Sequence, residues 1–71
     1  MSNDSKDFMV VRQVFKNAEW VMGKTKPVFF ATEVGAKNYA HGLKWLLTPI
    51  ERYVVYDIKN DKELDIVEVM D

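Results

Sequence analysis

Residues 28–57 have the sequence VFFATEVGAKNYAHGLKWLLTPIERYVVYD, and this segment decides the fold. Its short apolar start, Val28 to Ala31, is typical of a buried strand. Thr32 is a residue type that caps helix N-termini, and the stretch after it predicts a helix over residues 33–47. Pro49 marks the end of that helix, because the residue before a proline avoids helical geometry.

The end of this segment and the residues on either side of it predict β-strands. Residues 52–58 are rich in Tyr and Val, which favour strands. Residues 59–62 have the composition of a turn, and residues 63–70 return as the last strand of a C-terminal hairpin. Towards the N-terminus, the β-branched and aromatic residues of 7–16 and 20–22 favour a first hairpin.

A helix competes with this first hairpin over residues 8–22. Apolar side chains between Val11 and Met22 recur at three- and four-residue spacings, and Gly23 follows where a helix C′ residue would stand. We favour the hairpin, because the valines in this stretch are poorer helix formers than strand formers.

The element order β-β-(β)-α-β-β predicts an α+β fold, a small antiparallel or mixed sheet with one helix packed across one face. The 71 residues suffice for one domain, which we place at 7–71 after a flexible lead-in at 1–6. The chain has no cysteine, which excludes disulfides and thiolate-bound zinc. Its hydrophobic content of 48% is rich for so small an interior, which favours burial of apolar surface in a homodimer.

The predicted helix has two unlike faces. Its sheet-facing stripe consists of Ala36, Tyr39, Ala40, Leu43, Leu46 and Leu47. Val34, His41 and Trp45 lie opposite this stripe and are flanked by Lys37 and Lys44. This set predicts a partner-binding patch with Trp45 as its aromatic anchor. The alternative is that the N-terminal lead-in, or the segment that follows the helix, folds back over Trp45.

Gly35 and Gly42 lie nearly in line on one flank of the same helix. A glycine inside a helix costs about 1 kcal/mol relative to alanine, so two in line indicate the close approach of another backbone. That backbone is either a neighbouring loop of this chain or the same helix in a second subunit.

The strands are apolar on both sides. Val54, Tyr56 and Ile58 point one way along their strand, whereas Tyr53 and Val55 point the other way. A single helix covers only one face of a sheet, so the other face needs a homodimer or a host protein to shield it.

The sequence contains no catalytic motif. There is no cysteine, both serines lie in the lead-in, and His41 is the sole histidine, so we expect neither a catalytic triad nor a metal site. The three glycines are isolated, which excludes a glycine-rich phosphate loop. Asp57, Asp65 and Glu68 are the remaining candidates for acid–base chemistry, and a solvated strand face also explains them. We therefore predict no enzyme activity and no cofactor.

Charge gives little attraction to nucleic acid. The net charge is −1 with a pI near 5.7, and residues 57–71 hold six Asp and Glu against two Lys. A nucleic-acid-binding module is nevertheless our second hypothesis, because aromatic side chains on a small sheet can stack on bases. The residues that would serve it are Trp20, Phe29, Phe30, Tyr53, Lys24, Lys26, Lys37 and Arg52.

The polar N-terminus has no apolar core of a secretory signal, and no apolar run approaches the length of a membrane span. We expect a cytoplasmic location without membrane association.

The pattern FFATExxAKxYA at residues 29–40, followed by YVVYD at residues 53–57, resembles the strand–helix–strand arrangement of many small proteins from phage genomes. This resemblance implies a small viral accessory protein or inhibitor that binds a host component. It contains no functional motif, so it assigns no site residue. Together with the apolar strands and Trp45, it leads us to predict a non-enzymatic protein-interaction module that binds a protein partner or itself.

Overall fold

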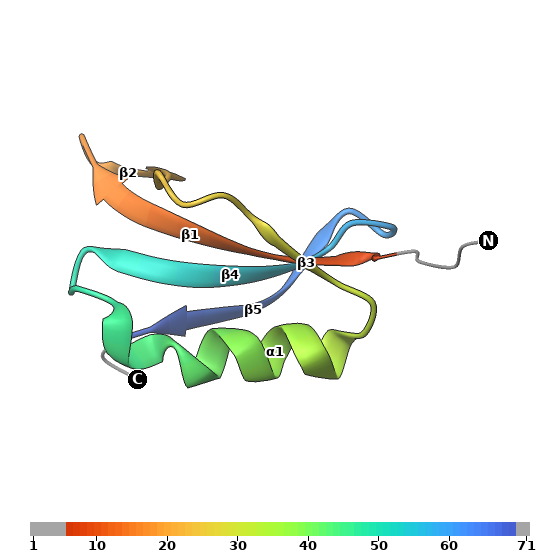
Figure 1. Ribbon diagram of the computed structural model, residues 1–71. Coiled ribbons are helices and arrows are strands. Elements are labelled where there is room, and N and C mark those ends of the chain that lie inside the picture. The colour runs from red at the N-terminus through yellow and green to blue at the C-terminus, as the bar shows by residue number, and fades with distance from the viewer. Residues whose placement is uncertain (1–5, 70–71) are drawn as a thin grey trace.

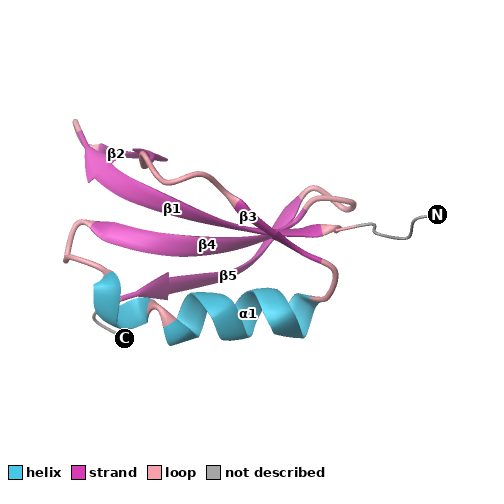
Figure 2. Ribbon diagram, in the orientation of Figure 1, coloured by secondary structure: helices cyan, strands magenta, loops and turns pink. Residues whose placement is uncertain are grey.

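The structure is a computed structural model that describes residues 6–69. It confirms a small α+β domain in which one helix packs against an antiparallel sheet (Figures 1 and 2). The elements are β1 (Phe8–Lys16), β2 (Glu19–Met22), β3 (Val28–Phe30), α1 (Glu33–Gly42), the 3-10 helix η1 (Lys44–Leu46), β4 (Glu51–Asp57) and β5 (Lys62–Glu68). Most of the lead-in predicted at 1–6, and the end of the last strand predicted at Met70, lie outside the described residues.

Strands β1 and β4 form the centre of the sheet. They pair over seven positions, from Phe8 opposite Asp57 to Val14 opposite Glu51. The strand order is β2-β1-β4-β5, and β3 pairs with the first part of β1, on the same edge as β2. Every pairing is antiparallel, so the sheet is antiparallel rather than mixed.

The N-terminal segment is a hairpin, and the competing helix is wrong. Strands β1 and β2 pair from Lys16 opposite Glu19 to Gln13 opposite Met22. Only Asn17 and Ala18 connect them, with φ angles of 55° and 66°. Two positive φ angles are those of a type I′ turn, whose twist matches that of the flanking strands.

Helix α1 begins as predicted but ends earlier. The side chain of Thr32 accepts a hydrogen bond from the Gly35 N–H at 3.0 Å, which makes Thr32 the N-cap. The α-helix ends at Gly42 rather than at residue 46 or 47, and the tighter η1 continues from it. Glycine is a poor helix former, and the change of pitch after it turns the following side chains to new directions. Leu47 is therefore buried, whereas Leu46, which we expected in the sheet-facing stripe, is exposed.

The core lies between α1 and one face of the sheet. Ala36 and Ala40 are fully buried in the helix, and their small side chains let it lie close to the strands. They meet Val10 and Val55 of the central pair and Val67 of β5. Tyr53 and Leu47 complete the buried cluster, which is small because only one helix covers the sheet.

Arg12 ties the connection between η1 and β4 to the sheet. Its Nη2 atom donates to the Glu51 carboxylate at 2.6 Å and to the Leu46 carbonyl at 3.3 Å. The same carboxylate oxygen accepts from the Thr48 N–H at 3.0 Å. This hydrogen bond from Arg12, followed by that from Thr48, holds the pKa of Glu51 below its usual value.

Replacement of Ala18 by Gly will stabilise the protein. The positive φ angle at residue 18 is unfavourable for alanine. We therefore expect Ala18→Gly to raise the free energy of unfolding by about 0.5–1 kcal/mol. This net value already subtracts the entropy that glycine adds to the unfolded chain. Urea unfolding will show a higher midpoint at an unchanged slope. Asn17→Gly is the matched control with a smaller gain, because Asn tolerates this region. A lower midpoint for Ala18→Gly would contradict the assigned turn.

Glu51 will make the stability depend on pH. A carboxyl whose pKa is lower in the folded state stabilises that state above its unfolded-state pKa of about 4.3, and this contribution is lost as the pH falls through the folded-state value. We expect the free energy of unfolding to fall as the pH drops below about 5, and to fall less steeply in Glu51→Gln. Urea titrations across this range measure both slopes, and equal slopes would contradict the role of this carboxylate.

Candidate interaction surface

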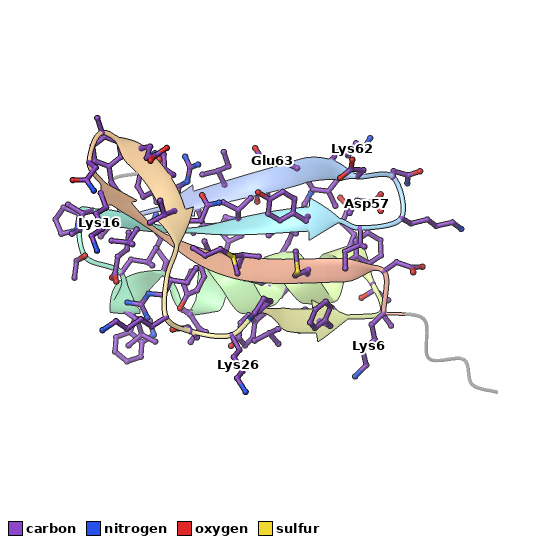
Figure 3. The ribbon with its side chains drawn as sticks, turned by 90° about the horizontal axis from the view of Figure 1, so that it is seen from above. Lys6, Lys16, Lys26, Asp57, Lys62 and Glu63 are labelled. Atoms are coloured by element: carbon purple, nitrogen blue, oxygen red, sulfur yellow. The ribbon has the colours of Figure 1, made fainter. Side chains whose placement is uncertain are left out.

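The side of the sheet turned away from α1 is called here the open face. Residues that pair directly across an antiparallel ladder share a face, so the registers assign its members. Its side chains are Met9, Val11, Gln13, Phe15, Trp20, Met22, Phe29, Arg52, Val54, Tyr56, Glu63, Ile66 and Glu68. Figure 3 views the sheet from this side, with the helix behind the strands. The expected division of Val54 and Tyr56 from Tyr53 and Val55 is confirmed.

The open face exposes much of the apolar surface of the described residues. Phe15, Met22, Phe29 and Ile66 are 39–56% exposed there. Ile50 and Ile58 extend this set at the two ends of β4. The Ile50 carbonyl accepts from the Phe15 N–H at 2.7 Å, and the Ile58 N–H donates to the Asp7 carbonyl at 2.8 Å. At the centre of the face, Val11 and Val54 are buried beneath their larger neighbours.

Aromatic and cationic side chains stack at one end of the open face. The rings of Phe15 and Trp20 meet edge to face, with 5.3 Å between their centroids. The Arg52 guanidinium lies over the Trp20 ring, 4.2 Å from its centroid, and its Nε atom donates to the Gln13 side chain at 2.8 Å. These contacts hold four side chains in defined positions, so this end of the face is preorganised.

Opposite charges border the open face on its two edges. Glu63 and Glu68 lie on β5, and Tyr56 makes a long hydrogen bond of 3.5 Å to Glu63. Burial, and secondarily Glu63, raises the pKa of the Tyr56 hydroxyl above its usual value. Lys24 and Lys26 lie in the loop between β2 and β3 at the other edge. Figure 3 shows Lys26 and Glu63 at opposite edges of the sheet.

The residues of the predicted helix-side patch extend along α1 and η1. Trp45 lies on η1 and is 76% exposed, so the segment after it does not cover it. Val34 is also exposed, but it belongs to the first turn of α1, whereas Lys44 begins η1. The five residues therefore extend along the whole helical segment, and Trp45 is their one exposed aromatic side chain.

Two members of that patch have partners close by. The His41 Nε2 atom lies 2.8 Å from the Asp65 carboxylate of β5, so the side chain reaches towards the sheet. This contact is the main cause that lowers the pKa of Asp65 below its usual value. Lys37 pairs with Glu33 one helical turn away, at 2.8 Å. His41 and Lys37 thus occupy the flank of α1 nearest β5.

The two helix glycines do not meet another backbone of the described chain. A Cβ atom at Gly42 would meet nothing within 4 Å, and one at Gly35 would lie 3.0 Å from the Thr32 hydroxyl. The neighbouring loop that we expected at these positions is absent from residues 6–69. Gly35 instead leaves room for the N-cap side chain, and a contact with a second subunit stays a prediction.

The residues of the nucleic-acid hypothesis are divided between the two sides of the sheet. Phe29 and Trp20 are on the open face, whereas Tyr53 is buried under the helix and Phe30 packs on Tyr39 with 5.1 Å between centroids. Lys37 lies on the helix. The set therefore forms no single stacking platform.

The carboxylates considered for acid–base chemistry have separate surroundings. Asp57 accepts two hydrogen bonds from Asn60, at 3.1 Å from its N–H and 2.7 Å from its side chain, and so shapes the turn after β4. Asp65 contacts His41, and Glu68 points to the open face. Among residues 6–69 no group of three or more His, Asp or Glu side chains is arranged to hold a metal ion. No helix in this part of the chain is long and apolar enough to cross a membrane.

Comparison with protein-family models, with curated proteins and with solved structures found no match to the chain. The evidence for function is therefore the geometry of its surfaces. Sequence reasoning named Trp45 as a candidate anchor but left its exposure open, and it did not assign Met22, Ile50 or Ile66 to a surface. The alternation of apolar residues along each strand is the pattern that identifies such side chains once the pairing of the strands is known.

Removal of the Trp45 side chain will leave the fold intact. Because this side chain is 76% exposed, we expect Trp45→Ala to change the free energy of unfolding by less than about 0.5 kcal/mol. Val55→Ala is the matched core variant, and we expect it to cost about 2 kcal/mol, since it removes two buried methyl groups and leaves a cavity. Urea unfolding compares the two. A loss of 2 kcal/mol in Trp45→Ala would show that Trp45 is structural.

Proposed function

We propose that this protein is a small non-enzymatic protein-interaction module that binds through the open face of its sheet. One observation carries the proposal: among residues 6–69 an apolar face stays uncovered, because helix α1 lies on the other side of the sheet. Six large apolar side chains are exposed on this face or at the ends of β4, and contiguous apolar patches of this kind mark interaction sites.

The construction of the open face suits binding. Its side chains stand on paired strands, so little conformational freedom remains to be lost when a partner docks. Aromatic side chains and arginine, which dominate interface energies, are present as Phe15, Trp20, Phe29 and Arg52. The charged borders on β5 and the β2–β3 loop give the polar rim that surrounds the apolar centre of many interfaces.

Trp45 supplies a second contact point of the same kind. Among the described residues of the helical segment, Val34 and Leu46 are also exposed, whereas the open face and the ends of β4 offer six such side chains, so the open face ranks first. The resemblance to small phage proteins supports an accessory or inhibitory role for such a module, exerted by occupying a protein surface.

A capture experiment with three baits tests this function. Tagged wild type, Met22→Gln/Phe29→Gln and Trp45→Ala are each offered a lysate of the source cell mixed with an untagged copy of the chain. We expect the wild type to retain a stoichiometric protein, Trp45→Ala to retain it, and the open-face variant to lose at least nine-tenths of it, because both replaced side chains are exposed on that face.

Circular dichroism and urea unfolding are the controls that each bait is folded. Loss of the retained protein with Trp45→Ala alone would move the site to the helix side. Retention of no protein by any bait would contradict an interaction module. Binding of a single-stranded oligonucleotide at low salt, lost in the open-face variant, would instead favour the nucleic-acid hypothesis, because phosphate contacts are strongest there.

A further inference from the structure

The charges around the open face are asymmetric in a way that matches a second copy of the chain. Glu63 and Glu68 place negative charge along β5 on this face. Lys24 and Lys26 place positive charge in the β2–β3 loop at the opposite edge, with Lys24 close to the helix-side residues Arg12 and Glu51. All four residues are exposed, and the apolar side chains lie between the two charged edges. A partner for this face needs an apolar centre, one basic edge and one acidic edge, and the protein itself has them.

Symmetry decides how two copies can meet. In a two-fold dimer the same surface serves both partners, so it must complement itself. Rotation about an axis that lies in the interface and runs parallel to β1 and β4 exchanges the two edges of the sheet. It places β5 of each subunit over the β2–β3 loop of its partner, acid against base. Rotation about an axis across the strands stacks β5 on β5, and the like charges then repel.

We infer that the open face is the interface of a face-to-face homodimer whose two-fold axis runs parallel to the central strands. This inference rests on the proposed function and names its partner. Glu63 and Glu68 of each subunit lie against Lys24 and Lys26 of the other, and the exposed side chains of the open face pack between them as in a two-sheet sandwich.

The dimensions of the open face give the approximate area of this dimer interface. Strands β4 and β5 are seven residues long, which corresponds to about 24 Å, and four strand positions span about 19 Å. A face of about 450 Å² in projection, enlarged by the relief of its side chains, approaches the smaller stable interfaces, which bury about 600 Å² per partner. Interfaces at this lower limit of size are typical of weak or transient complexes, so we expect dimers in exchange with monomers.

Charge reversal tests the inference. Sedimentation velocity of the full chain at low salt, from about 1 to 300 µM, will show wild-type monomers and dimers in exchange. Glu63→Lys/Glu68→Lys and Lys24→Glu/Lys26→Glu will each weaken dimerisation at least tenfold, because each makes both edges alike. The variant with all four changes will dimerise like the wild type, and so will an equimolar mixture of the two double variants. Urea unfolding of each variant controls for the fold.

Three results would overturn the inference. The first is a wild type that stays monomeric at every concentration. The second is a dimer that Glu63→Gln/Glu68→Gln strengthens, which would show acid facing acid. The third is a dimer that Trp45→Ala abolishes and charge reversal leaves unchanged. If the chain stays monomeric while its open face retains another protein in the capture experiment, only the dimer fails. If it retains none, the proposed function fails as well.

Discussion

The antiparallel pair of β1 and β4 is the constraint on which the rest of the structure depends. Its register places Val10 beside Val55 on one side and Val11 beside Val54 on the other, and all four are buried. Because side chains alternate along a strand, a shift of one residue would exchange the two sides. The registers of β2, β3 and β5 are all set against this pair. Both the helix-packed core and the open face follow from it.

Within residues 6–69 one helix covers only one side of a sheet that is apolar on both sides. Ala36 and Ala40 let α1 lie close to the strands and form the core with Val10, Val55 and Val67. The opposite side has only its own larger side chains to shield Val11 and Val54 from water. Apolar area in contact with water costs about 25 cal/mol per Å², so a partner that covers this face gains that free energy.

Sequence patterns predicted most elements, because their causes are local. Thr32 identified the N-cap of α1, and the Val- and Tyr-rich stretch identified β4. The end of α1 was misplaced, because Leu46 and Leu47 suit a helix equally well and a glycine inside a helical pattern, such as Gly42, does not by itself end a helix. Arg12, distant in sequence, binds the Leu46 carbonyl and Glu51 and so fixes where η1 gives way to β4. The contact of His41 with Asp65 could not be predicted for the same reason, since the sequence does not place β5 beside this flank of α1.

The sequence by itself determined the class of the fold, the absence of disulfides and the presence of two apolar strand faces. These properties depend on composition and on the periods of single elements. Tertiary structure alone decided which apolar residues share the open face and which charges border it. The reason is that Phe15, Met22, Phe29 and Ile66 come from four separate strands, and only the pairing of strands brings them to one surface. The same pairing sets β5, with its acids, opposite the basic β2–β3 loop.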